Sequence, residues 1–275
     1  MRDNRHVTRP PTWGRWGEDD ERGALNLLDG PAVLRGLAAA RRGEVIPLGL
    51  PVEARGTPVT PGRPPVLHTM LVDGADFEAG ARRGANGFQF ADDHLSMAVH
   101  SGTHLDALSH VGRDGLLYNG IPASEVRSRS GAFRLGVDKV GGVVCRGVLL
   151  DFVAEAGAPL EAGRALGVAD LERALARAGT ELAPGDAVLL RTGWLADRGV
   201  VLVGADNFGV EVIPSESGET LPVHLALLQE RGVYLLEMVD LVALAAAGTA
   251  TFALVLAPLR ITGGVGSPVN PLAVV

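Results

Sequence analysis

The chain has 275 residues, of which 47% are hydrophobic and 21% are charged, and its formal net charge is −7. This composition is typical of a globular protein and excludes a disordered or fibrous chain. Because the net charge is acidic and no long lysine- or arginine-rich run occurs, we expect a small-molecule partner and no nucleic acid.

The length and the residue pattern also indicate how the chain is organised. No linker or internal repeat divides it, so we expect a single domain over residues 1–275. Trp13 and Trp16 lie among acids and glycines without a period, which predicts an irregular N-terminal arm over residues 1–30. Cys145 is the only cysteine, so an intrachain disulfide is excluded, and the first residues lack the apolar core of a signal peptide. We therefore expect a cytoplasmic protein.

Beyond the arm, segments with helical periodicity alternate with segments typical of strands. Apolar residues recur at helical spacing in three segments that each end at a glycine: 31–43, 170–179 and 221–232. Strands are expected where apolar runs or alternating polarity occur between turn residues: 44–53, 65–74, 95–100, 146–153, 184–194, 233–241 and 250–258. The alternation predicts an α/β fold.

Residues 241–259 carry no charge and superficially resemble a membrane span. We interpret them as a short helix after Asp240 that ends at Gly248, followed by a buried strand closed by Pro258. The flanking charges show no anchoring asymmetry, so no membrane association is expected.

Three of the seven histidines and one aspartate lie within eleven residues: His100, His104, Asp106 and His110. All four occupy even-numbered positions. Their side chains therefore lie on one side of an extended chain, and they still share one arc if the chain becomes helical after Gly102. Either conformation lets the four side chains converge, and a turn at Gly102 would bring His100 and His104 together.

Two imidazoles and a carboxylate supply donors suited to Zn²⁺, Mn²⁺ or Fe²⁺, and three protein ligands leave one coordination position open. A metal with an open position activates water and polarises a carbonyl oxygen, so an uncharged amide or ester can be attacked at neutral pH. His110 suits a general base or acid, because the ordinary pKa of histidine is about 6.5. The alternative is that the histidines cluster by accident.

The segment HSGTHLDALSH resembles the H-x-G-T-H-x-D-x-x-x-H signature of the metal-dependent cyclase family, which includes bacterial kynurenine formamidase and isatin hydrolase. The resemblance extends along most of the chain, through WGEDDERGALNLL, LLYNG, APGDAVLLRTGW, VEVIPS, LPVHLALL, GVYLLE and GSPVNPLAV. It implies a compact α/β domain, in which helices surround a curved, barrel-like mixed sheet of the swivelling β/β/α type. It also implies assembly into a homodimer or homotetramer.

Position by position, the resemblance implies that His100, His104 and Asp106 bind the metal and that His110 is the catalytic histidine. It further implies that His224 and Glu237 approach the same centre, as in members with two ions, where the aspartate bridges them. The implied cofactor is one or two ions of zinc or manganese. Taken alone, Glu237 could instead be an edge-strand carboxylate facing water, and His224 a helix histidine with its hydrogen bonds satisfied.

The implied function is that of a metal-dependent amidohydrolase similar to arylformamidases. It would open a carbon–nitrogen bond of an N-formyl aryl amine or a cyclic amide with metal-activated water. Leu108 replaces a proline of the small formamidases, which also lack the arm carrying Trp13 and Trp16. Two alternatives stay open: a cyclase or lactonase acting on a small carbonyl substrate, and a non-catalytic metal-binding protein. Structural zinc sites usually have four ligands and are rich in cysteine, unlike this pattern.

Four further residues and one segment have weaker signals. Tyr118 and Asn119 could line a pocket or form a turn. Residues 262–268 favour a plain turn over an anion cradle, because they lack the lysine of a phosphate-binding loop. We expect His94 to make a structural hydrogen bond and Cys145 to pack as a small hydrophobe.

Overall fold

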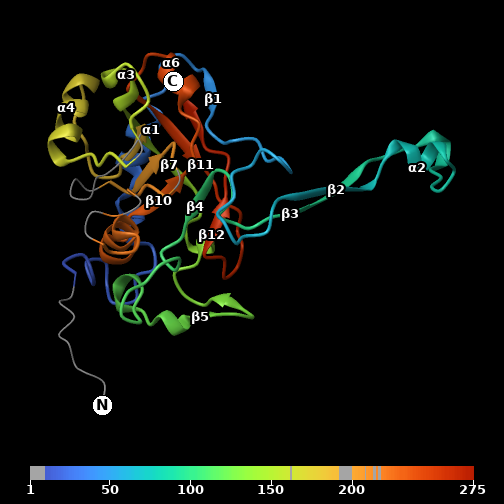
Figure 1. Ribbon diagram of the computed structural model, residues 1–275, viewed down its shortest axis with the longest axis horizontal. Coiled ribbons are helices and arrows are strands. Elements are labelled where there is room, and N and C mark those ends of the chain that lie inside the picture. The colour runs from blue at the N-terminus through green and yellow to red at the C-terminus, as the bar shows by residue number, and fades with distance from the viewer. Residues whose placement is uncertain (1–9, 162, 192–199, 208, 213–214, 216–217) are drawn as a thin grey trace.

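A strongly curled mixed β-sheet of nine strands forms the centre of the fold (Figure 1). The computed structural model describes residues 10–161, 163–191, 200–207, 209–212, 215 and 218–275. In order across the sheet the strands are β1 (Val45–Pro47), β13 (Leu272–Val274), β11 (Thr251–Leu256), β7 (Val143–Asp151), β8 (Ala187–Arg191), β9 (Leu202–Ala205), β10 (Tyr234–Glu237), β4 (His104–Asp106) and β12 (Gly266–Pro268). The predicted α/β fold with a curved mixed sheet is confirmed.

The middle of the sheet is parallel and its two sides are antiparallel. Strands β7, β8, β9 and β10 run parallel to one another. On either side of them, β11 pairs antiparallel with β7, and β4 pairs antiparallel with both β10 and β12. Residues 187–190 of β8 and 202–205 of β9 are buried throughout. Continuous apolar strands of this kind are expected in a parallel sheet that is covered on both faces.

Helix α1 (Gly30–Leu37) packs against β7. The Asp29 carboxylate caps the helix by accepting from the backbone N–H of Ala32. At Gly36 the backbones approach so closely that an added Cβ would lie 2.3 Å from the backbone carbon of Cys145. The helix ends at Leu37, before the expected Gly43. The following residues leave the helix because the backbone N–H of Arg42 donates to the carbonyl of Val275 at the C-terminus.

Helix α4 (Val168–Ala178) begins two residues earlier than expected and ends at Gly179, as expected. Asp170 lies in the first turn and accepts from the backbone N–H of Gly167. Segment 221–232 forms α5 (Pro222–His224) and the π-helical η6 (Leu225–Arg231), which ends at Gly232. The remaining short elements are α2 (Gly74–Glu78), α3 (Phe152–Ala156), β5 (Val126–Arg127), β6 (Gly131–Ala132) and the 3-10 turns η1 (Gly23–Leu27), η2 (Ala85–Gly87), η3 (Tyr118–Gly120), η4 (Ala123–Glu125) and η5 (Val137–Lys139).

Most expected strands occur, with different ends. Segment 184–194 contains β8, and its residues 192–194 lie outside the described part of the chain. Segment 44–53 contributes only the three residues of β1. Residues 241–259 form α6 (Val242–Ala246) and then β11, as expected. No helix within the described residues is long and apolar enough to cross a membrane.

The strand expected over residues 95–100 is wrong in its position and its environment. Strand β3 (Asp92–Ser96) stops at Ser96, because its partner β2 (Leu67–Val72) begins at Leu67, directly opposite Ser96. Leu95 is 50% exposed, so the alternating pattern does not mark a face buried in the sheet.

Strands β2 and β3 instead form a ribbon that projects from the domain and carries α2 near its far end (Figure 1). The base of the ribbon is tied to the segment that precedes β4. The Arg63 guanidinium donates to the carbonyl of His100, and the N–H of Gly102 donates to the carbonyl of Pro58. Hydrogen bonds therefore connect the base of the ribbon with the segment that carries His100.

The described part of the N-terminal arm, from residue 10 onwards, is held by hydrogen bonds to distant segments. The Trp13 indole donates to the carbonyl of Gln229 over 2.8 Å. The Asn119 amide accepts from the N–H of Gly14 and donates to the carbonyl oxygens of Gly17, Glu18 and Asp20. Of the two roles expected for Asn119, lining a pocket or forming a turn, these hydrogen bonds support the structural role in the turn.

Candidate metal centre

Strand β4 places two of the motif side chains on the same face of the sheet. Successive residues of a strand point to opposite faces, so His104 and Asp106 share one face and the fully buried Leu105 occupies the other. The chain enters β4 through a turn in which Gly102 has φ +58°. Thr103 fixes this turn by donating its hydroxyl to the carbonyl of Met238 over 2.5 Å. After Gly102 the chain is therefore extended, not helical.

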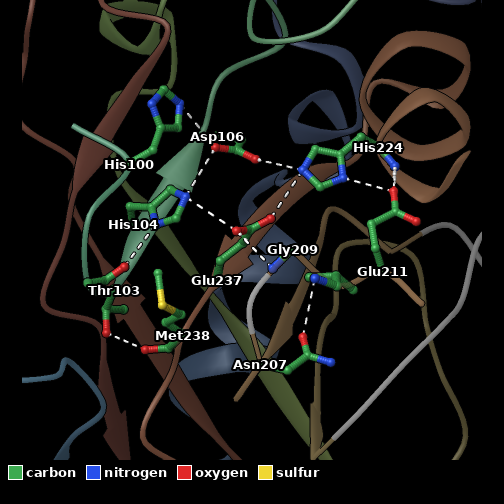
Figure 2. Close-up of polar contacts among 12 residues, drawn as sticks. His100, Thr103, His104, Asp106, Asn207, Gly209, Glu211, His224, Glu237 and Met238 are labelled. Atoms are coloured by element: carbon green, nitrogen blue, oxygen red, sulfur yellow. Dashed lines mark hydrogen bonds and ion pairs between the residues drawn. The ribbon is translucent and has the colours of Figure 1, made fainter. Parts of the chain in front are cut away.

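Glu237 reaches the same face from the neighbouring strand β10, where it lies directly opposite His104 in the antiparallel register. Its Oε2 is 3.4 Å from Nε2 of His104 and accepts from the N–H of Gly209 (Figure 2). Glu237 is 4% exposed and is the last residue of a parallel strand, the end at which α/β sheets usually bind ligands. It is not an edge-strand carboxylate facing water.

His224, the last residue of α5, completes this side of the cluster (Figure 2). Its Nε2 lies 3.2 Å from Oε1 of Glu237 and 3.6 Å from Oδ2 of Asp106. The two carboxylates therefore have imidazoles on both sides, His104 on one and His224 on the other.

His100 and His110 approach Asp106 from irregular segments on either side of β4. Nε2 of His100 lies 3.2 Å from Oδ1 of Asp106. The chain turns after β4, with the N–H of His110 donating to the carbonyl of Ala107, and the two imidazole rings stack with centroids 4.1 Å apart. The structure thus brings together all six residues singled out from the sequence.

The donor atoms of this cluster fit a divalent metal. Several of them are buried and make no hydrogen bond within the described part of the chain: Nε2 of His100, both oxygens of Asp106 and Oε1 of Glu237. Buried carboxylate oxygens are costly unless a cation or a donor compensates them. Two overlapping groups have ligand atoms within 4.8 Å of one another, His100 with Asp106 and His110, and His104 with Asp106 and Glu237. Asp106 belongs to both groups.

Comparison with known proteins gives the family. A model of the family described as Putative cyclase matches residues 46–221, well over half of the chain. The chain belongs to this cyclase family. A solved structure described as a novel cyclase is 35% identical, with a TM-score of 0.90 and coverage of 97% of this chain and 100% of its own. The family expected from the histidine motif is confirmed.

Isatin hydrolases share the cyclase fold at lower identity. One, bound to the product analogue thioisatinate, is 20% identical with a TM-score of 0.59, covering 90% of this chain and 99% of its own. Another, from Ralstonia solanacearum, is 21% identical with a TM-score of 0.60, covering 88% and 95%. No curated protein matches this cyclase-family sequence.

Burial and charge shift the pKa values of three groups in this cyclase-family site. Burial opposes ionisation of Asp106, but the imidazoles of His110, His100 and His104 outweigh it and lower the pKa of Asp106 well below its ordinary value. Burial, together with the neighbouring histidines, lowers the pKa of His110 to about 4 despite the attraction of Asp106. For His224, contacts with the Glu211, Glu237 and Asp106 carboxylates outweigh burial and raise the pKa to about 10.

Sequence reasoning missed Glu211. Its Oε1 accepts from the backbone N–H of His224 over 2.8 Å and contacts the ring Nδ1 over 3.0 Å. The residue lies in the VEVIPS stretch that contributed to the resemblance, but no spacing rule connects it with His224. Only the folded chain shows the contact.

A cavity of about 570 Å³ lies next to the cluster, with His110 in its wall. The rest of the described lining mixes apolar and polar residues: Val111, Gly112, Arg113, Glu219, Thr220, Leu221 and Leu225. Arg113 and Glu219 form an ion pair of 3.1 Å. A small molecule in this cavity would contact His110.

The remaining candidates lie outside the cluster. Tyr118 donates its hydroxyl to the Asp20 carboxylate and packs in the core. Cys145 is buried on β7, and burial raises the pKa of its thiol to about 12, as expected for a packing residue. His94 lies on β3 of the exposed ribbon. Of residues 262–268, the first four form a turn and the last three are β12.

Proposed function

We propose that this protein is a metal-dependent hydrolase that opens a carbon–nitrogen bond of a small amide, either an N-formyl aryl amine or a cyclic amide. The observation that carries the proposal is that both oxygens of Asp106 and Oε1 of Glu237 are buried among imidazoles and make no hydrogen bond within the described residues. Membership of the cyclase family supports it. The shared fold with isatin hydrolases, whose name gives a cyclic amide as their substrate, supports the proposed substrate class.

The residues that would hold the metal divide around Asp106. His100, His104 and Asp106 would bind one ion, and His224 and Glu237 would join Asp106 in binding a second. Nitrogen and oxygen donors of this kind suit zinc or manganese. When bound, the metal supplies a Lewis acid that polarises the substrate carbonyl and makes water a nucleophile at neutral pH.

In the proposed reaction, His110 would move the proton. Because its pKa is lowered to about 4, its imidazole is neutral at pH 7 and can accept a proton. His110 would take the proton from the attacking water as the new carbon–oxygen bond forms. It would return that proton to the nitrogen as the carbon–nitrogen bond breaks, giving a carboxylic acid and an amine.

The cavity beside His110 favours a small substrate with an apolar part. Val111, Leu221 and Leu225 offer an apolar wall, which suits an aryl or cyclic group. Leu221 has φ +53°, an uncommon conformation for a branched residue and one found at functional sites more often than elsewhere. The cavity therefore supports the same substrate class.

The two alternatives make different predictions. A cyclase or lactonase would use the same residues on another carbonyl compound, and only a substrate screen separates it from an amidohydrolase. A non-catalytic metal protein would lose its fold when a chelator removes the metal, whereas the enzyme would stay folded and become inactive.

The decisive experiment measures metal per chain by mass spectrometry in the purified protein and in His104→Ala. We expect a ratio near one or two that collapses in the variant, because His104 contacts both carboxylates. His68→Ala is the matched control, since His68 lies on the ribbon and pairs with Asp93. A folded wild-type protein that takes up neither Zn²⁺ nor Mn²⁺ would overturn the proposed function.

A further inference from the structure

One carboxylate oxygen of Glu211 contacts two nitrogen atoms of a single residue, His224 (Figure 2). The Glu211 side chain is 1% exposed, and its other oxygen is buried without a hydrogen bond in the described part of the chain. We propose that Glu211 is a positioning residue that fixes His224 for metal binding. The inference rests on the proposed function.

The contact decides which ring nitrogen of His224 faces the metal cluster. An ionised carboxylate only accepts hydrogen bonds, so Nδ1 carries the hydrogen that points to Glu211. Nε2 is then the nitrogen directed at Glu237, 3.2 Å away, and at Asp106, 3.6 Å away. A hydrogen bond from the second ring nitrogen is the usual way in which proteins orient a metal-binding histidine.

His224 needs such a contact more than His104 does. Nδ1 of His104 lies 2.8 Å from the carbonyl of Gly102 in the adjoining turn, and the ring projects from a paired strand. His224 instead ends the three-residue helix α5, after Leu221 in a left-handed conformation, and is followed by a π-helical segment. Local structure therefore constrains His224 weakly, and Glu211 supplies the constraint from the segment after β9.

The second contact of Glu211 strengthens this assignment. By also accepting from the backbone N–H of His224, the same oxygen fixes the main chain from which the ring projects. Loss of the side chain would release both backbone and ring. We therefore expect metal affinity to be lost only in the half of the site that contains His224.

The test compares Glu211→Ala and Glu211→Gln with the wild-type protein in Zn²⁺ affinity and stoichiometry, measured on metal-free protein by chelator competition. We expect Glu211→Ala to weaken the affinity that depends on His224 by about 10- to 100-fold. In Glu211→Gln the amide oxygen can still accept both hydrogen bonds, so this variant should lose less Zn²⁺ affinity than Glu211→Ala. Glu44→Gln is the control, because Glu44 is exposed and pairs with Arg42, and this substitution should not change metal affinity.

A double-mutant cycle separates positioning from a general structural role. In a His224→Ala background, Glu211→Ala should cause no further loss of affinity, because no imidazole remains to be oriented. An equal loss in both backgrounds would overturn the inference. If Glu211→Ala fails to fold, the cycle with Glu211→Gln decides in the same way.

The outcomes also distinguish this inference from the proposed function. A wild-type protein that binds no metal would overturn both. A wild-type protein that binds metal, together with a folded Glu211→Ala of unchanged affinity, would overturn the role of Glu211 alone.

Discussion

His104 and Glu237 lie directly opposite each other on β4 and β10, with Nε2 and Oε2 3.4 Å apart. The pair exists because the antiparallel β4 is inserted beside the last strand of the parallel set. Both side chains project from paired backbone, so the candidate metal centre has a rigid base. Sites built on strands hold their geometry more closely than sites built on loops.

The His110→Ala variant tests the proton-transfer role. We expect turnover of N-formyl aryl amines or lactams to fall by about 10²- to 10⁴-fold, the usual contribution of a general base. Metal content should survive, because the residues proposed as ligands are unchanged. Turnover and metal per chain are measured together, with His68→Ala as the control. Turnover retained at the wild-type level would rule out this role.

The raised pKa of His224 predicts that metal affinity depends on pH. With a pKa of about 10, His224 is an imidazolium cation, protonated on both ring nitrogens, in the metal-free protein at neutral pH. A metal ligand must be neutral imidazole, so binding releases one proton and the apparent affinity rises with pH, by up to about tenfold per unit.

Chelator competition between about pH 6 and pH 9 measures this slope. In His224→Ala, the slope of the logarithm of metal affinity against pH should be smaller by one, because one proton fewer is released on binding. Equal slopes in the two proteins would show that His224 does not exchange its proton for the metal.

Gly266 of β12 predicts a variant that disturbs the site through packing alone. It pairs with Asp106 in the sheet, and an added Cβ would lie 2.4 Å from Nε2 of His100. Gly266→Ala should therefore push the His100 ring away from Asp106 and lower metal affinity while the protein stays folded.

Gly142→Ala is the matched control, since the nearest atom to its added Cβ is 3.9 Å away. Metal titration and circular dichroism of both variants give the comparison. An unchanged affinity in Gly266→Ala would show that His100 is not needed at the site.

The projecting ribbon leads to a prediction about assembly. Six of its large apolar side chains are between 43% and 63% exposed: Leu67, Met70, Leu71, Phe88, Phe90 and Leu95. A two-stranded ribbon is marginally stable by itself, and exposed apolar patches of this kind mark interaction sites. We propose that the ribbon packs against a second copy of the chain, in the homodimer or homotetramer that the sequence resemblance implies.

Light scattering after size-exclusion chromatography tests the assembly. The wild-type mass should be two or four times that of one chain, and Leu71→Glu should shift it towards one chain, because a buried charge opposes association. Val242→Glu, at an exposed site on α6, should leave the mass unchanged. A monomeric wild-type protein would contradict the prediction.

The sequence by itself determined the features that depend on neighbouring residues. The spacing of His104 and Asp106 places them on one face of a strand whatever that strand pairs with, because side chains alternate. The glycines that end α4 and η6, and the helix and strand within residues 241–259, follow from local turn and apolar patterns. The family motif then gave the curved α/β fold.

Only the tertiary structure decided how distant segments meet. The register that sets Glu237 opposite His104, the contact of Glu211 with His224 and the closeness of Gly266 to His100 all depend on strand order and on loop paths. The misplaced strand at 95–100 has the same origin, since its end is set by the partner beginning at Leu67. Local patterns describe which face a residue occupies, but pairing between remote segments is a property of the whole packed chain.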